Sequence, residues 1–274
     1  MSQGKPGPSP LTITVTERAR ALLAGMPSPD VLNATLRLMA KWRAQVLANT
    51  LRARSGTTVL SGPFQGMRYD VAASEGAWAA RLLGGYEASL APVLETVIAR
   101  GYPQILDIGC AEGYYAIGLA RRMPQARVYA HDINPAARAL AAQSAVANGV
   151  ADRVILGGAF GHPDFDLCQR ARTFVLCDIE GAEDALLDPV AAPGLLSADI
   201  LVEVHEGMKP GLMDRLAARF APTHRVTRIG RRISGDSLPD WTESLGDLDR
   251  LLLLWEWRSS PTPWLWLERK EADA

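Results

Sequence analysis

The chain has 274 residues, 48% of them hydrophobic and 22% charged, an ordinary globular composition that excludes a wholly disordered protein. Its formal net charge of −1 gives no overall preference for nucleic acid or for a membrane surface. The three cysteines suggest neither a disulfide framework nor a zinc site, so we expect a reducing, cytoplasmic compartment. The polar opening MSQGKPGPSP lacks the apolar core of a signal peptide, and the longest apolar runs are too short to span a bilayer.

Residues 1–100 are predicted to form a tail, a helical cap and a short hairpin, followed by a second domain at 101–274. Helices are expected at 12–24 and, capped by Asp30, at 30–54. A strand at 57–62 and a turn-rich segment at 62–70 predict the hairpin, and helices follow at 74–84 and from Tyr86 to Gly101. Basic residues predominate up to residue 54, which we interpret as a solvated helix face rather than an arm for an acidic partner.

From residue 101 onward, predicted strands and helices alternate. Strands are expected at 104–108, 126–132, 153–156, 173–178, 199–204, 224–229 and 251–257. Helices are expected between them at 112–122, 135–148, 182–187 and 211–220. The strands are continuous apolar runs such as FVLC and ILVEV, which is typical of strands covered on both faces. The pattern predicts an α/β fold with a Rossmann-like, doubly wound, mostly parallel sheet.

The segment LDIGCAEG, residues 106–113, joins the first of these strands to its helix. A dinucleotide loop needs G-x-G-x-x-G, but here Ala111 stands between Gly109 and Gly113. Glu112 opens the helix, where a carboxylate suits the helix dipole but repels a phosphate. We therefore expect a nucleoside whose pendant group carries an amine and a carboxylate instead of phosphates.

Asp132 ends the second strand. An acid in this place can hydrogen-bond both ribose hydroxyls of a nucleotide. The alternative is a helix cap before Pro135, since Asp is a good capping residue. His131, one residue earlier, is expected to point the other way and to be structural.

LDIGCAEG resembles motif I of the class I S-adenosylmethionine-dependent methyltransferases, with Ala111 as a departure from the commoner glycine. CDIEGAEDALLDP (177–189) and ILVEVHE (200–206) resemble the FkbM-type branch of these enzymes. The resemblance covers roughly residues 60–206. It implies a seven-stranded methyltransferase sheet with S-adenosyl-L-methionine as cofactor, and it says little about the substrate.

The resemblance also implies roles for particular residues. Gly109, Ala111 and Gly113 would let the backbone pass the methionine part of the cofactor, and Asp107 would orient its amino group. Asp132 would hold the ribose while Ile133 packs on adenine. The remaining contacts are expected from Ala159 and Phe160 at the adenine edge and from Tyr86 and Glu87 on the cap side.

Catalytic candidates lie at the ends of the fourth and fifth strands. Asp178 and Glu180 follow the fourth strand, and Glu203 and His205 lie at the end of the fifth. His205 could be a general base oriented by an acid, or Asp178, Glu203 and His205 could bind a divalent cation. The cation is not favoured, because the acids could equally hold an amine substrate. The structural alternative is that Glu180 and Glu183 support the short helix and that His205 is a hydrogen-bonded loop residue.

These features predict an enzyme that methylates a hydroxyl of a small molecule of sugar or natural-product type. N-methylation, methylation of RNA or protein, and a cofactor-binding module without turnover are the alternatives. An NAD-dependent oxidoreductase is a further one, against which Ala111 and Glu112 argue. Neither a nucleic-acid nor a membrane partner is favoured, and a homo-oligomer is compatible with the sequence. Four tryptophans at alternating positions, Trp255, Trp257, Trp264 and Trp266, are interpreted as core and edge cover rather than as a stacking platform.

Overall fold

The computed structural model describes residues 7–71, 77–258 and 260–270. Contacts divide the chain into two compact units: unit 1 holds residues 1–56 and 238–255, and unit 2 holds residues 57–237 and 256–274. Residues 57–100, which the sequence grouped with the N-terminal helices, thus belong to unit 2. The role of unit 1 as a cap stays a prediction. Within the described ranges, no helix is both long and apolar enough to cross a membrane.

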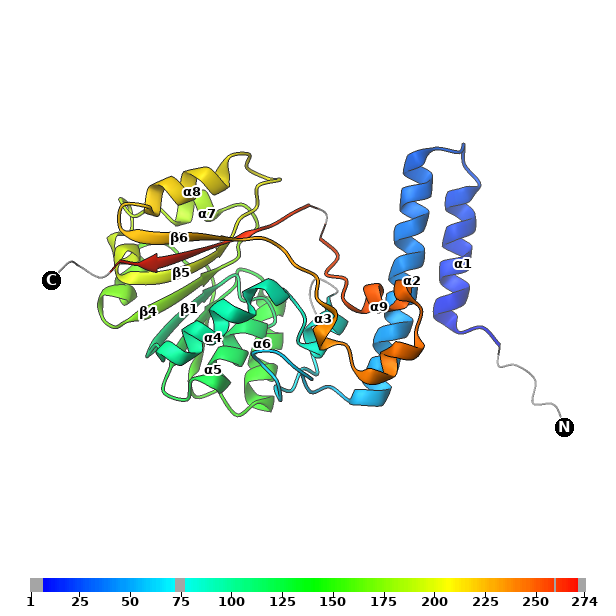
Figure 1. Ribbon diagram of the computed structural model, residues 1–274, viewed down its shortest axis with the longest axis horizontal. Coiled ribbons are helices and arrows are strands. Elements are labelled where there is room, and N and C mark those ends of the chain that lie inside the picture. Colours follow the sequence, from blue (N-terminus) through cyan, green and yellow to red (C-terminus); the bar gives the residue numbers. More distant parts are fainter. Residues whose placement is uncertain (1–6, 72–76, 259, 271–274) are drawn as a thin grey trace. The chain divides into compact units, whose positions relative to one another are not determined.

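Unit 1 contains an antiparallel pair of helices, α1 (Pro10–Leu23) and α2 (Pro29–Ser55), which Figure 1 shows in blue. Each begins with a serine cap followed by proline, the residue best suited to the first helical position. The predicted capping by Asp30 is wrong, because Ser28 accepts the hydrogen bond from the NH of Val31. Asp30 lies in the first turn instead, where its charge still suits the helix dipole.

The predicted strand at 251–257 is also wrong. Residues 247–253 form α9 (Asp247–Leu253), preceded by the 3₁₀ helix η5 (Asp240–Ser244). Asp247 and Asp249 place negative charge in the first turn of α9, which favours a helix over a strand. Arg43 of α2 holds α9 through Asp249, with Nε donating to Oδ1 at 2.7 Å and Nη2 donating to Oδ2.

Unit 2 is built on a seven-stranded sheet in the order β3-β2-β1-β4-β5-β7-β6 (Figure 1). The strands are β1 (Gln104–Ile108), β2 (Arg127–His131), β3 (Val154–Gly157), β4 (Thr173–Cys177), β5 (Ala198–Glu203), β6 (His224–Ile229) and β7 (Trp264–Arg269). The first five are parallel to one another, and β7 runs antiparallel to both β5 and β6. The predicted doubly wound, mostly parallel sheet is confirmed. Its order reverses between β1 and β4, where such sheets bind ligands.

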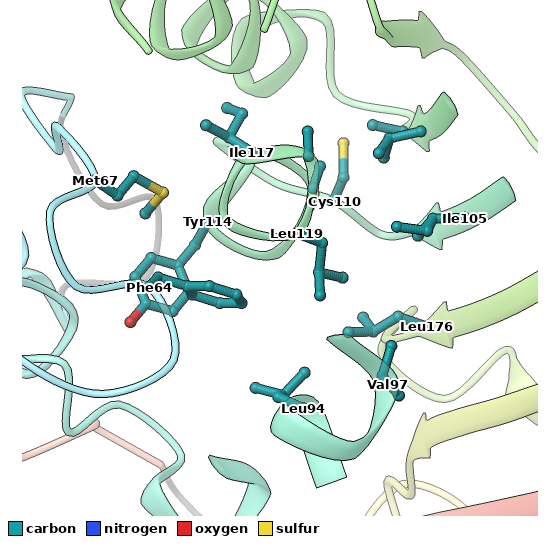
Figure 2. Packing of buried hydrophobic residues seen from close by; sticks show 14 of the residues in the cluster. Phe64, Met67, Leu94, Val97, Ile105, Cys110, Tyr114, Ile117, Leu119 and Leu176 are labelled. Atoms are coloured by element: carbon teal, nitrogen blue, oxygen red, sulfur yellow. The ribbon is translucent and has the colours of Figure 1, made fainter. Parts of the chain in front are cut away.

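Helices cover both faces of this sheet. Figure 1 shows α4 (Ala91–Arg100), α5 (Tyr114–Arg122) and α6 (Pro135–Ala147) on one face, with α7 (Glu183–Leu186) and α8 (Leu212–Phe220) on the other. Successive strand residues point to opposite faces. Ile105 therefore joins the cluster with Leu94 and Leu119 that Figure 2 shows, and Leu106 joins the cluster with Leu216. Both faces are apolar, which explains the continuous apolar runs in the sequence.

The described part of unit 2 before β1 is mostly irregular. Besides α4 it contains α3 (Trp78–Leu83) and η1 (Ala88–Leu90). The other 3₁₀ helices among the described residues of the unit are η2 (His162–Gln169), η3 (Pro193–Ser197) and η4 (Gly235–Ser237). The expected hairpin reduces to one antiparallel bridge between Thr58 and Arg68. The helix expected at 74–84 is helical from Trp78, and 72–76 lie outside the described residues. The helix expected from Tyr86 starts later, because Glu87 adopts a left-handed φ of 48°.

Candidate active site

The loop between β1 and α5 contains three residues with positive φ angles. Gly109 and Gly113 have φ of 87° and 89°, and Ala111 between them has φ of 46°. A Cβ atom on Gly109 would lie 1.6 Å from the carbonyl oxygen of Asp178, so only glycine lets the loop pass the end of β4. Ala111 tolerates its left-handed conformation at a cost of about 1–2 kcal/mol.

Asp132 follows β2 and contacts this loop. Its Oδ2 accepts a hydrogen bond from the backbone NH of Ala111 at 2.9 Å, and its Oδ1 accepts one from the NH of Asn134 at 2.7 Å. The cap of α6 is Asn134, whose side chain accepts from the NH of Ala136, so Asp132 is not the helix cap. A carboxylate has about four acceptor sites, so Asp132 can still accept hydrogen bonds from ligand hydroxyls.

A cavity of about 530 Å³, here called the cofactor cavity, lies where the carboxyl ends of β1 to β4 meet. Its volume is within the range of small-molecule sites. Seven of the residues expected to bind the cofactor line it: Tyr86, Gly109, Ala111, Asp132, Ile133, Ala159 and Phe160. Ile133 is 82% exposed, an apolar surface that a ligand ring could cover.

The three other residues expected at the cofactor do not line this cavity. Gly113 makes room for α5, because a Cβ atom there would lie 2.6 Å from Cδ1 of Ile117. Asp107 is 1% exposed, and burial raises the pKa of its carboxyl to about 7. The charge of Asp132 adds to this rise, whereas a hydrogen bond from the backbone NH of Ala116 opposes it. Any contact of Asp107 with a ligand would therefore run through the loop or through water. Glu87 lies in a separate buried network.

One end of the cofactor cavity is a buried ion pair that the sequence did not reveal. Glu112 Oε1 accepts from Nη1 of Arg81 at 2.7 Å and from the hydroxyl of Tyr69 at 2.5 Å. Arg81 also lies 4.2 Å from the ring centre of Tyr86. Because Arg81 compensates Glu112, this end carries both signs of charge, which suits a zwitterion better than a pyrophosphate.

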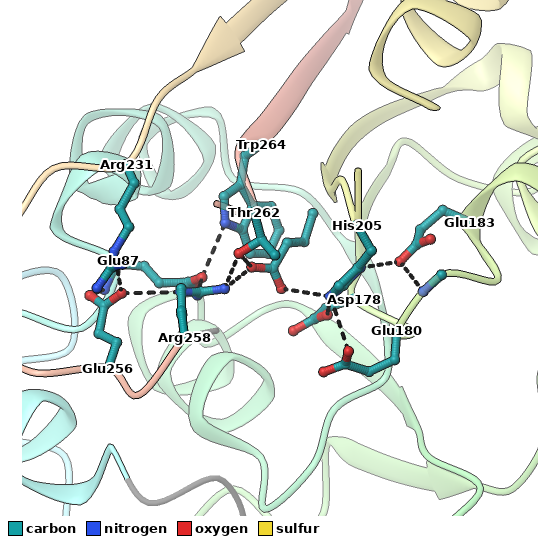
Figure 3. A network of polar contacts seen from close by, with 12 residues as sticks. Glu87, Asp178, Glu180, Glu183, His205, Arg231, Glu256, Arg258, Thr262 and Trp264 are labelled. Atoms are coloured by element: carbon teal, nitrogen blue, oxygen red, sulfur yellow. Dashed lines mark hydrogen bonds and ion pairs between the residues drawn. The ribbon is translucent and has the colours of Figure 1, made fainter. Parts of the chain in front are cut away.

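The catalytic candidates converge on one buried imidazole (Figure 3). His205 Nδ1 lies 2.6 Å from Glu183 Oε1. On the other side of the ring, Nε2 lies 3.3 Å from Glu180 Oε2 and 3.7 Å from both Asp178 Oδ1 and Glu203 Oε2. The structure therefore brings Asp178, Glu180, Glu203 and His205 together as the sequence predicted.

The hydrogen bond to Glu183 helps to raise the pKa of His205. Burial lowers the pKa of His205, but the hydrogen bond to Glu183 and the charges of Glu203, Glu183 and Glu180 outweigh it and raise the pKa above 6.5. Glu183 is fully buried and also accepts from the NH of Gly181 at 3.0 Å. The sequence placed Glu183 on the short helix and missed this contact, because His205 is 22 residues away.

This cluster can act in more than one way. Neutral His205, with its Nδ1 proton held by Glu183, would turn a basic Nε2 toward the carboxylates. Asp178, Glu203 and His205 also offer one ligand atom each, all within 4.8 Å of one another, so the cluster could hold a cation. The residues that the sequence named as metal candidates do lie together.

A second network surrounds Arg258 (Figure 3). Its guanidinium pairs with Glu87 and Glu203 and, at 3.2 Å, with Glu256. Glu87 also accepts from Nε1 of Trp264 at 3.1 Å. Burial, reinforced by the charge of Glu203 and opposed by Arg258, raises the pKa of Glu87 to about 8. Glu87 therefore contacts Arg258 and Trp264 and does not line the cofactor cavity.

A smaller cavity, here called the second cavity, measures about 230 Å³. It shares Tyr86 and Glu180 with the cofactor cavity. Its other lining residues come from after β5 and from before β7: Glu203, His205, Gly207, Met208, Glu256, Trp257, Arg258, Ser260 and Thr262. Of these residues, the sequence predicts only Glu203 and His205 as site residues.

His131 lines the cofactor cavity, and its ring packs edge-on against Phe160 with 4.9 Å between centroids. The carboxylate of the next residue, Asp132, contacts the NH of Ala111 instead. The two side chains therefore have different partners, which agrees with the expectation that they point different ways, and a structural role for His131 stays a prediction.

Residues 105–185, from β1 into α7, match the family model of a methyltransferase domain. The match contains the β1–α5 loop, Asp132 and Asp178, and the sheet around it has the order described above. The chain carries a class I, S-adenosylmethionine-dependent methyltransferase domain. This confirms the resemblance of residues 106–113 to motif I of the class I methyltransferases.

The methyltransferase domain is similar to curated enzymes that modify proteins. The chain is 34% identical over 146 residues to a release factor glutamine methyltransferase of Cereibacter sphaeroides, covering 50% of each chain. It is 36% identical over 84 residues to a ribosomal protein L11 methyltransferase of Brucella suis, covering 30% of this chain and 29% of the relative. The chain thus spans half or less of the length of these relatives.

Solved structures similar to this chain include two O-methyltransferases. One, TomG from Streptomyces achromogenes in complex with SAM, has 16% identity and a TM-score of 0.46, covering 84% of this chain and 90% of TomG. The other, from Bacillus cereus in complex with SAH, has 14% identity and a TM-score of 0.45, covering 83% of this chain and 90% of that enzyme.

Proposed function

We propose that the protein transfers the methyl group of S-adenosylmethionine to a hydroxyl oxygen of a small molecule. The observation that carries this proposal is the position of His205. Its Nε2 atom faces Asp178 and Glu180, which also line the cofactor cavity, so a base stands at the edge of that cavity.

The cofactor cavity fits this cofactor without phosphate-binding elements. Asp132 would accept hydrogen bonds from the ribose, and Ile133 and Phe160 would pack on the adenine. The backbone of residues 109–113 would pass the methionine part, whose ammonium and carboxylate suit the Arg81–Glu112 pair. Asp107 would act on the ammonium indirectly, because it lies beneath the loop.

When bound, S-adenosylmethionine supplies a methyl group on a positively charged sulfur that becomes a neutral thioether. The residues of this chain would position the acceptor hydroxyl and take its proton. His205 Nε2 is the proton acceptor, and Glu183 fixes the tautomer that leaves this nitrogen free to accept. Asp178, Glu180 and Glu203 stabilise the imidazolium that results.

Membership of the FkbM-type branch is part of the proposal. In the segment 178–183, Asp178 and Glu180 face His205 Nε2 and Glu183 binds Nδ1, so each acid of the Asp-x-Glu-Gly-x-Glu pattern contacts one imidazole. Gly181 between them has φ of 93°, which glycine adopts readily. These contacts support a common function for the pattern. A cytoplasmic location is likewise proposed, supported by three buried free thiols.

A second candidate is methylation of a protein or nucleic acid, including N-methylation. The curated relatives favour it, since both named above carry the name of a protein target. Their similarity covers 30–50% of this chain, so the acceptor of those enzymes is a proposal for this protein. A domain that binds the cofactor without turnover is the remaining alternative.

The test is incubation of the protein with methyl-labelled S-adenosylmethionine and an extract of the source organism, with and without EDTA. We expect label in the low-molecular-weight fraction, unchanged by EDTA and absent with His205→Asn. Label in acid-precipitable material would favour the second candidate, and loss of label with EDTA would favour a catalytic cation. S-adenosylhomocysteine binding without any labelled product would favour the binding module.

A further inference from the structure

We propose that the second cavity is the acceptor site and that it takes a small hydroxyl compound bearing an amine, of the amino-sugar type. The proposal rests on the methyl-transfer function above and adds the chemical class of the acceptor. It is carried by the cavity's position, size and charge, all of which come from residues of unit 2.

The position and size of the cavity suit a small acceptor. Tyr86 and Glu180 separate it from the cofactor cavity, and His205 lines it. His205 is 4% exposed. Within the described ranges its Nε2 makes ion-pair contacts but no hydrogen bond, so a ligand hydroxyl could donate a hydrogen bond to this nitrogen. The volume of about 230 Å³ lies below the roughly 300–1,000 Å³ that encloses drug-sized ligands. It leaves room for one ring or one terminal group.

Charge selects the kind of acceptor. The carboxyl groups that line the cavity or contact its lining residues are Glu87, Asp178, Glu180, Glu183, Glu203 and Glu256. The cations there are Arg81, which lies over the ring of Tyr86, Arg231, Arg258 and, when protonated, His205. With Glu87 protonated and His205 charged, five carboxylates still face four cations. In a partly desolvated site this excess repels a phosphate or carboxylate and attracts an ammonium group.

Glu180 is the carboxylate best placed to meet that ammonium. Arg258 already engages Glu203 and Glu256, whereas the ion pair of Glu180 among the described residues is with His205. Its side chain is 61% exposed, and its φ of 52° holds it between the two cavities. Such a conformation is disfavoured for a residue other than glycine and is common at functional sites. Trp257 adds an aromatic face that can stack on a sugar ring or face a cation.

The first experiment measures the charge of the methylated product. The protein is incubated with methyl-labelled S-adenosylmethionine and the small-molecule fraction of the source organism, and labelled products are separated on cation and anion exchangers at pH 5. We expect the product on the cation exchanger. A neutral or anionic product, or label confined to macromolecules, would overturn the acceptor class while leaving methyl transfer intact. If no product forms, methyl transfer itself fails and this inference falls with it.

The second experiment uses variants. For the product found above, Glu180→Gln should raise the acceptor KM about fivefold, because a half-exposed ion pair is lost. The affinity for S-adenosylhomocysteine should change less than about twofold. Glu95→Gln, which removes an exposed carboxylate on α4, is the matched control and should leave both unchanged. An unchanged KM in Glu180→Gln would overturn the proposal. So would a tight Mn²⁺ site detected by paramagnetic resonance and abolished in Glu203→Gln, since the negative charge would then serve a metal.

Discussion

The two cavities of unit 2 share a wall but are built in different ways. The cofactor cavity is lined mainly by short stretches that follow β1, β2, β3 and β4, each next to the strand that positions it. The second cavity joins residues at and after the end of β5 to residues 256–258, 260 and 262, with Arg258 as the common partner of three carboxylates. The first is shaped by local turns, whereas the second is shaped by long-range ion pairs. A cavity built from local turns leaves a motif in the sequence, and a cavity built from long-range ion pairs does not.

A substitution at Gly109 should disrupt the cofactor cavity most strongly. Gly109→Ala places a methyl group within 1.6 Å of the Asp178 carbonyl oxygen at a φ of 87°, so we expect it to destabilise unit 2 by more than about 4 kcal/mol. Thermal unfolding should show a Tm lower by roughly 10 °C or more. Gly158→Ala is the control, because its Cβ would meet no atom within 4 Å. An unchanged Tm in Gly109→Ala would show that the loop does not pass β4 so closely.

Asp132→Ala should weaken S-adenosylhomocysteine binding by about 100-fold, because two charge-assisted hydrogen bonds to the ribose are lost. Isothermal titration calorimetry measures the affinity directly. Asp152→Ala, at a side chain that is 75% exposed, serves as the control and should bind normally. Equal affinities of the two variants would remove Asp132 from the proposed ribose contact.

A smaller effect should follow from the titration of Asp107. Its pKa of about 7 means that the carboxyl is neutral below this pH and charged above it. Since the cofactor carries an ammonium group, S-adenosylhomocysteine affinity should rise up to about tenfold between pH 6 and pH 8. Asp107→Asn should flatten this dependence in calorimetric titrations. An identical pH dependence in the variant would assign the effect to another group.

The smallest expected effect is a shift in titration on the acceptor side. The chain has four histidines, so NMR titration can follow each imidazole, with His205→Asn assigning one resonance. We expect His205 to titrate above 6.5 and His224 below it, because burial dominates at His224. Glu183→Gln should lower the pKa of His205, since burial then acts without the hydrogen bond and its charge.

The same titration has a consequence for stability. Because the folded-state pKa of His205 is raised, its charge stabilises the fold fully below pH 6.5, and this contribution is lost as pH rises through the raised value. A wild-type His205 that titrates below 6.5 would contradict the contact with Glu183.

The sequence predicted most of the sheet, because its central strands β1, β4 and β5 are apolar runs bounded by turn residues. It failed at 251–257, where a leucine run fits a buried helix segment as well as a strand, and the acids at 247 and 249 decide the outcome. It also located the loop at 109–113 and the acids after β4, since these lie within one motif. Arg81, Glu256 and Arg258 could not be found, because their partners are brought close only by the fold and no local spacing marks them.

We expect a sulfonium nucleoside to bind in the cofactor cavity with its sugar at Asp132. A crystal structure of the protein with S-adenosylhomocysteine, the thioether product of this cofactor, checks that position. We expect the ribose hydroxyls within hydrogen-bond distance of the Asp132 carboxylate, the adenine against Ile133 and Phe160, and the sulfur toward Asp178 and Glu180. A nucleoside bound elsewhere, or lying in this cavity with its sugar away from Asp132, would contradict the claim.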